Sequence, residues 1–120
     1  MRKRSKSKAT LDKADRQVQD YYRAKFPKGR CESCGRLFSL IHHFIEKSKS
    51  NYLRFNIINF IFICKKCHSL HHCFGDSSIH ARIILHKGEK WLEEIIKASR
   101  IKRESFSKGE LEKIIKLWTI

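Results

Sequence analysis

The sequence predicts an α+β domain in which a two-stranded hairpin and the helix after it are held together by zinc and flanked by helices at both ends. Three observations lead to this prediction. Two Cys-x-x-Cys pairs, Cys31/Cys34 and Cys64/Cys67, bracket the central segment. Two runs rich in Ile and Phe lie between the pairs, and this composition is typical of strands. Helical spacing of the Cys and His residues begins after Cys64, so the expected local order is strand, loop, strand, helix.

The N-terminal part of the chain combines a basic segment with an amphipathic helix. Residues 1–9 are basic and nearly free of apolar side chains, so we expect a flexible tail that burial cannot order. A helix is predicted over residues 10–26, because apolar side chains recur there at three- and four-residue steps. Pro27 and Gly29 end this helix. A chain of 120 residues fits one domain, which we expect to extend over residues 10–120.

The core of this domain is predicted over residues 31–75. Residues 37–45 and 55–63 suit two strands, and the polar residues 46–51 between them suit a loop. The helix that follows is expected to begin near Lys65.

Further helices are predicted over residues 78–119, where they serve as scaffold. A short helix capped near residue 78 is broken by Gly88. Ser107 and Glu110 have the spacing of a capping box, which predicts the start of the last helix. The apolar faces of the two later helices are formed by Trp91, Leu92, Ile95 and Ile96, and by Leu111, Ile114, Ile115 and Trp118.

The charge of the chain is strongly unbalanced. It carries 27 Lys and Arg residues against 12 Asp and Glu residues, which gives a formal net charge of +15. A charge this large repels itself unless a polyanion is bound. Nucleic acid is the polyanion that we expect, with an anionic membrane surface as the alternative. The positive charge is spread along the whole chain rather than gathered in one basic amphipathic segment, which favours nucleic acid.

No membrane partner is expected. The longest apolar run, residues 57–64, is interrupted by Asn59 and is too short to span a bilayer. The basic residues at the N-terminus are not followed by the apolar stretch of a signal peptide. We therefore expect a cytoplasmic location, in the host cytoplasm if the chain is phage-encoded.

Four of the five cysteines form the two Cys-x-x-Cys pairs, and this spacing indicates a closed four-cysteine site for structural Zn²⁺. The four ligands would be Cys31, Cys34, Cys64 and Cys67. A thioredoxin-like redox pair is the alternative, but two pairs occur and no βαβ pattern surrounds either of them. The remaining cysteine, Cys73, is expected to be a half-buried thiol.

The histidines suggest a second metal site. His42 and His43 are adjacent at the end of the first predicted strand, where neighbouring side chains point to opposite faces. His68 and His72 have i,i+4 spacing, which places two imidazoles on one face of a helix and suits two ligands of one ion. His71, at i,i+3 from His68, is the alternative second ligand from this helix.

Taken in order, these motifs resemble a known family. Cys-x-x-Cys, His-His, Asn59 and Cys-x-x-Cys-His follow one another between Cys31 and His72 as they do in the zinc-bearing HNH, or ββα-metal, endonucleases. The resemblance implies a zinc-stapled HNH hairpin-helix core and a metal-dependent nuclease.

A looser resemblance, to the phage NinG/Rap recombination proteins, covers more of the chain. The matching features are the segments His43-Phe-Ile and Leu53-Arg-Phe-Asn56, and the later helices that contain Trp91 and Trp118. This second resemblance implies DNA recombination intermediates, such as branched DNA, as substrates.

The HNH resemblance also implies roles for individual residues. His43 would be the general base, and Asn59 would orient it through its backbone or its ring. His42 and His68 would hold the catalytic ion, with His72 as the third ligand. Three imidazoles suit Zn²⁺, Ni²⁺ or Mn²⁺ better than Mg²⁺ by ligand softness, whereas such nucleases commonly use Mg²⁺. All four ions therefore remain candidates.

Basic residues on both sides of these motifs are expected to bind backbone phosphates, which positions a duplex without reading its bases. They are Arg36, Lys47, Lys49, Arg54, Lys65 and Lys66. DNA is the expected partner and RNA is not excluded, because phosphate contacts do not distinguish the sugars. Three alternatives remain: a non-catalytic zinc module that binds nucleic acid, an RNA-directed nuclease or RNA-binding accessory protein, and a toxin-type nuclease.

Overall fold

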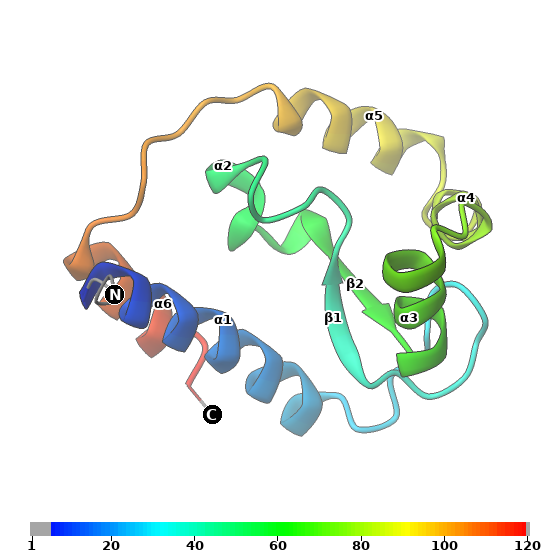
Figure 1. Ribbon diagram of the computed structural model, residues 1–120, viewed down its shortest axis with the longest axis horizontal. Helices are drawn as coiled ribbons and strands as arrows, with labels where there is room; N and C mark the ends of the chain where they lie inside the picture. The colour runs from blue at the N-terminus through cyan, green and yellow to red at the C-terminus, as the bar shows by residue number, and fades with distance from the viewer. Residues whose placement is uncertain (1–5, 120) are drawn as a thin grey trace. The chain divides into compact units, whose positions relative to one another are not determined.

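The computed structural model describes residues 6–119 (Figure 1). Their contacts form two compact units. One unit contains the described parts of the terminal segments 1–27 and 104–120, and the other extends over residues 28–103. The two terminal helices form the first unit because they pack against each other, and the single domain expected over residues 10–120 stays a prediction.

The terminal unit pairs α1 (Lys6–Lys25) with α6 (Lys108–Leu117). Val18 of α1 and Leu111 of α6 are almost completely buried. Trp118 follows α6, and its backbone carbonyl accepts a hydrogen bond from Gln17 Nε2 at 3.1 Å. The predicted capping box of Ser107 and Glu110 is confirmed.

The predicted boundary between tail and first helix needs correction. The helix α1 begins at Lys6, so residues 6–9 are helical, because this polar segment continues the helical hydrogen bonding of the amphipathic helix behind it. The rest of the predicted tail, residues 1–5, lies outside the described residues.

The other unit is built on a small antiparallel sheet of β1 (Leu40–His43) and β2 (Phe60–Ile63). The register pairs His42 with Ile61 and His43 with Phe60. A mixed fold of helices and one two-stranded sheet confirms the α+β class.

Both strands are shorter than predicted. The first half of the segment predicted as the second strand, residues 55–63, instead contains the 3₁₀ helix η1 (Ile57–Asn59), and the short helix α2 (Asn51–Arg54) precedes it. Ser50 Oγ accepts a hydrogen bond from Leu53 N at 3.1 Å, and Asn56 Oδ1 accepts one from Ile58 N at 3.1 Å. Such local caps compete with a strand for the backbone, and here they prevail.

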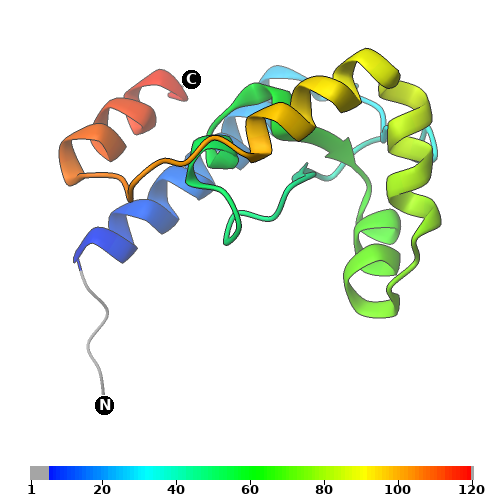
Figure 2. The same ribbon diagram turned by 90° about the horizontal axis from the view of Figure 1, so that it is seen from above.

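Three helices follow the sheet, as predicted: α3 (Lys65–Phe74), α4 (Ser78–Lys87) and α5 (Glu89–Ser99). Gly75 ends α3 with a φ of 62°, a backbone conformation that glycine adopts without strain. Figures 1 and 2 show α4 beside α3 and α5 beside α2, in agreement with the contacts between these pairs. Within the described residues, every helix is too short or too polar to cross a bilayer.

Two apolar clusters form the interior of this unit, and Phe44 and Trp91 contact both. The larger cluster joins the cysteines to the sheet and to α4, and its buried members are Cys31, Ile61, Ile63, Cys64, Cys67, Ile79 and Ile83. The smaller cluster lies under α5 and is centred on Leu53 and Ile95. The cysteine pairs are therefore part of the core rather than appended to it.

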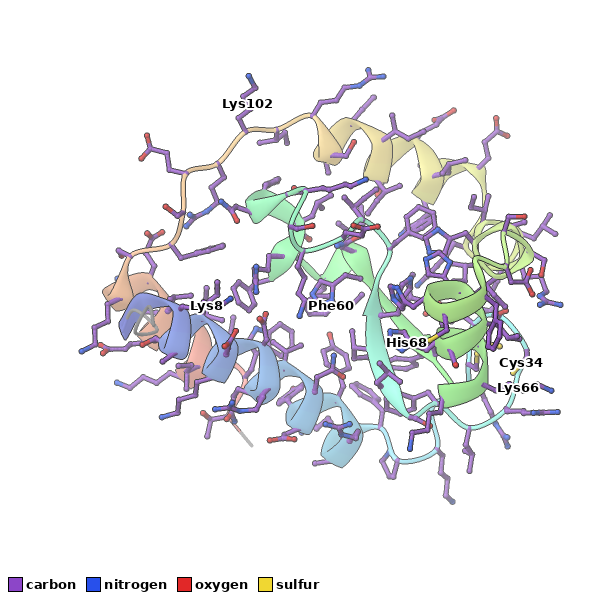
Figure 3. All side chains as sticks on the ribbon, in the orientation of Figure 1. Lys8, Cys34, Phe60, Lys66, His68 and Lys102 are labelled. Carbon is purple, nitrogen blue, oxygen red and sulfur yellow. The ribbon has the colours of Figure 1, made fainter. Side chains whose placement is uncertain are left out.

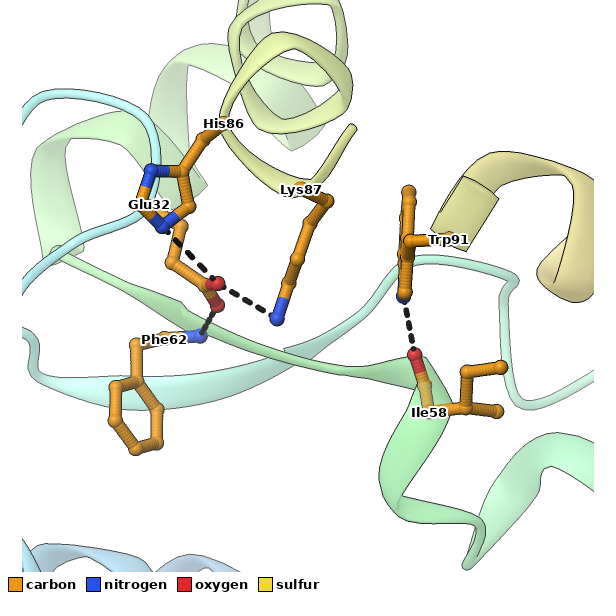
Figure 4. Close-up of polar contacts among 6 residues, drawn as sticks. All are labelled: Glu32, Ile58, Phe62, His86, Lys87 and Trp91. Carbon is orange, nitrogen blue, oxygen red and sulfur yellow. Dashed lines mark hydrogen bonds and ion pairs between the residues drawn. The ribbon is translucent and has the colours of Figure 1, made fainter. Parts of the chain in front are cut away.

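Two polar contacts fasten helices to the sheet (Figure 4). The Glu32 carboxylate accepts a hydrogen bond from Phe62 N at 2.7 Å and forms an ion pair with Lys87 at 2.7 Å. The Trp91 indole N–H donates to the carbonyl oxygen of Ile58 at 2.9 Å. The first contact links the first cysteine pair, β2 and α4, and the second links α5 to η1.

We expect Glu32→Ala to lower the free energy of unfolding by about 2 kcal/mol, because the Glu32 side chain is only 11% exposed and both its contacts are charge-assisted. His86 also faces Glu32, but at 3.7 Å and with a side chain that is 61% exposed, so His86→Ala should change stability by less than about 0.5 kcal/mol. Urea unfolding of the zinc-loaded proteins measures both values. Equal stability of the two variants would contradict this account.

Candidate metal centres

Four cysteine sulfurs converge on one point. The Sγ atoms of Cys31, Cys34, Cys64 and Cys67 lie within 4.8 Å of one another. Cys34 Sγ and Cys64 Sγ are 3.6 Å apart. A tetrahedral Zn²⁺ with Zn–S bonds of about 2.3 Å holds its sulfurs about 3.8 Å apart, so the cluster fits this ion. All four are free thiols. The structure thus shows a four-cysteine group that could hold a structural metal such as zinc.

The backbone explains why these sulfurs meet. In the first pair, Gly35 N donates to the carbonyl oxygen of Cys31 at 2.9 Å, and Gly35 has a φ of 81°, which closes the turn without a Cβ clash. In the second pair, Cys64 caps α3, and its sulfur accepts a hydrogen bond from Cys67 N at 3.4 Å. The tight turn therefore directs the sulfurs of the first pair toward a shared centre, and the start of α3 directs the sulfurs of the second pair toward the same centre.

Burial of the cluster makes uncompensated thiolates unfavourable there. Cys31, Cys64 and Cys67 are buried, and Cys34 is exposed. Burial raises the pKa of the Cys67 thiol above its usual range. Four thiolates in this position need a positive ion to compensate them, and Zn²⁺ supplies that charge.

A second group brings together the histidines that the sequence predicted as ligands. His42 from β1 meets His68 and His72 from α3, and one nitrogen from each ring lies within 4.8 Å of the other two. The ring of His42 has its centroid 5.6 Å from that of His68 and 5.4 Å from that of His72. Figure 3 shows His68 on the side of α3 that faces β1. The strand and the helix therefore bring their imidazoles to one place, and metal binding there stays a prediction.

Two of these imidazoles, His42 and His68, are held in the neutral form that binds metals. His42 is 4% exposed, and burial, helped by the nearby His80 and His68 rings, lowers its pKa to about 2. Burial also lowers the pKa of His68. A neutral imidazole keeps a nitrogen lone pair that can ligate an ion.

Sequence reasoning missed His80. It lies on α4, and its Nε2 is 2.9 Å from His42 Nε2, so that one ring donates an N–H to the other. His42, His71 and His80 form a further group of ligand nitrogens within 4.8 Å. The i,i+3 spacing of His71 had pointed to this residue as an alternative ligand. No motif pointed to His80, because it comes near His42 only through the packing of α4 on α3.

Among the described residues, His43 belongs to neither of the two groups of imidazoles that could hold an ion. Strand alternation turns it to the face opposite His42, where its ring lies against Phe60 with centroids 5.2 Å apart. Its Nε2–H donates to the carbonyl oxygen of Arg54 at 2.8 Å. The predicted base is thus oriented by a backbone carbonyl from α2.

Asn59 is fully buried. It was predicted to lie on the second strand, but it lies in η1, directly before β2. Its Oδ1 accepts a hydrogen bond from Ile45 N at 2.7 Å. Its Nδ2 donates to the carbonyl oxygens of Ile45 at 2.9 Å and Leu53 at 3.3 Å. These contacts fit orientation of His43 through the backbone rather than through its ring. Asn59 holds the backbone at Ile45, which lies two residues after His43.

Asn59→Ala should lower the free energy of unfolding by about 2–4 kcal/mol, because it leaves up to three buried backbone groups of Ile45 and Leu53 without their partner. Asn51→Ala is the matched control, since Asn51 makes one partly buried hydrogen bond of 3.3 Å, to Arg103. Thermal unfolding of both variants tests the difference. A control as unstable as Asn59→Ala would show that Asn59 has no special role.

The six basic residues predicted to bind phosphates all lie in the unit of residues 28–103. Arg54 is half-buried in α2, and the others are exposed: Arg36, Lys47, Lys49, Lys65 and Lys66. Lys65 and Lys66 lie in the first turn of α3, between Cys64 and Cys67 in the sequence, and Figure 3 shows Lys66 near Cys34. Their exposure suits phosphate contacts, and the binding itself stays a prediction.

Comparison with protein-family models, curated proteins and solved structures gives no significant match.

Proposed function

We propose that this chain is a metal-dependent endonuclease of the HNH type, which hydrolyses phosphodiester bonds in DNA. One observation carries the proposal. His42, His68 and His72, widely separated in the sequence, offer one nitrogen each within a sphere small enough for a single ion. A zinc module that only bound nucleic acid would need the four-cysteine group and the positive charge but not these imidazoles.

The chemistry of the donor set supports a divalent ion at this place. Three neutral imidazoles suit Mn²⁺, Ni²⁺ or Zn²⁺, and Mg²⁺ would depend more on water and phosphate oxygens for its remaining ligands. An ion held there supplies positive charge to the scissile phosphate and to the leaving oxygen. His72 is exposed and His42 is buried, so one side of this group faces solvent, from which a phosphate can approach.

His43 is the proposed general base. Its hydrogen bond to the Arg54 carbonyl selects the tautomer with the proton on Nε2, which places the lone pair on Nδ1. Nδ1 would accept a proton from the attacking water, and a neutral histidine near pH 7 is well suited to this step. Hydrolysis would leave a 5′-phosphate and a 3′-hydroxyl.

Two further groups support this chemistry. Asn59 fixes the backbone that follows His43, so the ring is carried by a rigid segment. The exposed Lys65 and Lys66 at the start of α3 would hold backbone phosphates on the four-cysteine side of the helix. Neither group reads bases, so we expect cleavage with little sequence preference. The looser NinG/Rap resemblance favours branched DNA.

The test is a cleavage assay with zinc-loaded protein. A supercoiled plasmid, a four-way DNA junction and a linear DNA duplex are each incubated with Mg²⁺, Mn²⁺, Ni²⁺ or Zn²⁺. We expect cleavage with at least one ion, 5′-phosphate ends, and the junction cut faster than the duplex. Faster cleavage of a matched RNA would favour the RNA-directed alternative. Tight DNA binding without cleavage under any ion would favour the non-catalytic zinc module.

A further inference from the structure

We propose that His42, His71 and His80 form a second metal position, which takes a borderline transition-metal ion such as Zn²⁺ or Co²⁺ in place of an ion at His42, His68 and His72. The ligand nitrogens of this group lie within 4.8 Å of one another. His42 is buried, and the other two are half-buried. The group joins three elements, β1, α3 and α4, whereas the first group joins only β1 and α3.

The distances in this group suit an ion after a small adjustment. His42 Nε2 and His80 Nε2 are 2.9 Å apart, and two nitrogens on one tetrahedral Zn²⁺ are about 3.4 Å apart. The rings of His71 and His80 are stacked, with centroids 4.1 Å apart and an angle of 14° between their planes. An ion at this position requires the half-buried His71 ring to turn out of this stack. It also requires the ring that donates in the His42–His80 hydrogen bond to move its proton from Nε2 to Nδ1, which frees the Nε2 lone pair for the ion.

A nearby negative charge favours a cation at this second position. Burial lowers the pKa of His71 and of His80, and the charge of the exposed Glu46 acts in the opposite direction on both rings.

The two positions exclude each other because they share His42. A neutral imidazole has one N–H and one nitrogen lone pair, so His42 can ligate one ion at a time. We therefore expect one ion per chain in the imidazole cluster, in addition to the ion of the four-cysteine group. An ion at the second position would also fasten α4 to the hairpin through His80.

Metal binding tests this proposal without reference to cleavage. Protein with zinc in its four-cysteine group is titrated with Co²⁺, and binding is followed by visible absorption and by equilibrium dialysis. His68→Ala/His72→Ala removes two ligands of the first position and keeps the second intact. We expect this double variant still to bind one Co²⁺ per chain.

Adding a third substitution locates the ion. His68→Ala/His72→Ala/His80→Ala should bind Co²⁺ at least about tenfold more weakly than the double variant. His68→Ala/His72→Ala/His86→Ala is the matched control, because His86 lies on the same helix but faces Glu32, and it should bind like the double variant. Loss of Co²⁺ binding in the double variant, or equal binding by the two triple variants, would overturn the second position. Neither result decides whether the chain is a nuclease.

Discussion

Replacing His43 with alanine is expected to lower the rate of DNA cleavage by about 100- to 10,000-fold while both metal centres keep their ions. The reason is geometric. His43 lies outside the imidazole groups, on the opposite face of β1, so its loss removes a proton acceptor without removing a ligand. Cleavage of plasmid DNA and metal content per chain, measured on the same preparation, give both quantities.

His86→Ala is the control for this prediction, since it removes an exposed histidine that forms only a long ion pair with Glu32. It should cleave at the wild-type rate. An active His43→Ala variant would show that another group takes the proton. A His43→Ala variant that unfolds would show that the hydrogen bond to Arg54 serves the fold, and the role of base would then have to be given up.

The second large effect is expected for Cys34→Ser, which should lose the structural zinc and lower the free energy of unfolding by at least about 3 kcal/mol. Cys34 is exposed, so the exchange of sulfur for oxygen costs little packing and the loss reports on the metal. The other three sulfurs belong to the buried cluster that joins the sheet to α4, so loss of the ion should loosen this whole region.

Cys73→Ser is the matched control for Cys34→Ser, because Cys73 is also exposed but belongs to none of the metal-ligand groups of the described residues. We expect it to keep its zinc and its melting temperature. Zinc content by mass spectrometry and thermal unfolding before and after treatment with a chelator measure both variants. A Cys34→Ser protein that melts like Cys73→Ser would exclude a four-cysteine site that stabilises the fold.

The four-cysteine group could be predicted from the sequence because its geometry is local. Each Cys-x-x-Cys pair needs only a turn or a helix start to aim two sulfurs, and Gly35 and the cap at Cys64 provide these. The pairing of His68 with His72 was predictable for the same reason, since i,i+4 spacing puts both rings on one face of a helix. The exposed state of Cys73 differs from the half-buried thiol that was expected, because Cys73 lies on the outer side of α3.

Features that depend on tertiary packing could not be predicted in this way. His80 reaches His42 only because α4 packs on α3, and no spacing within the sequence encodes that approach. Residues 55–59 belong to the segment predicted as the second strand, but the cap from Asn56 folds residues 57–59 into η1. The separation of the two terminal helices from the rest likewise depends on contacts between residues far apart in the sequence.

The measurement that tests the central claim most directly is the cleavage rate of His68→Ala/His72→Ala compared with that of the wild-type chain, both zinc-loaded and at a saturating concentration of the preferred ion. The two lost imidazoles are two of the three ligands of the proposed catalytic ion. We predict that the wild-type chain cuts DNA and that the double variant, still folded and still carrying its structural zinc, is at least about 100-fold slower. Cleavage by the double variant at the wild-type rate would contradict the account.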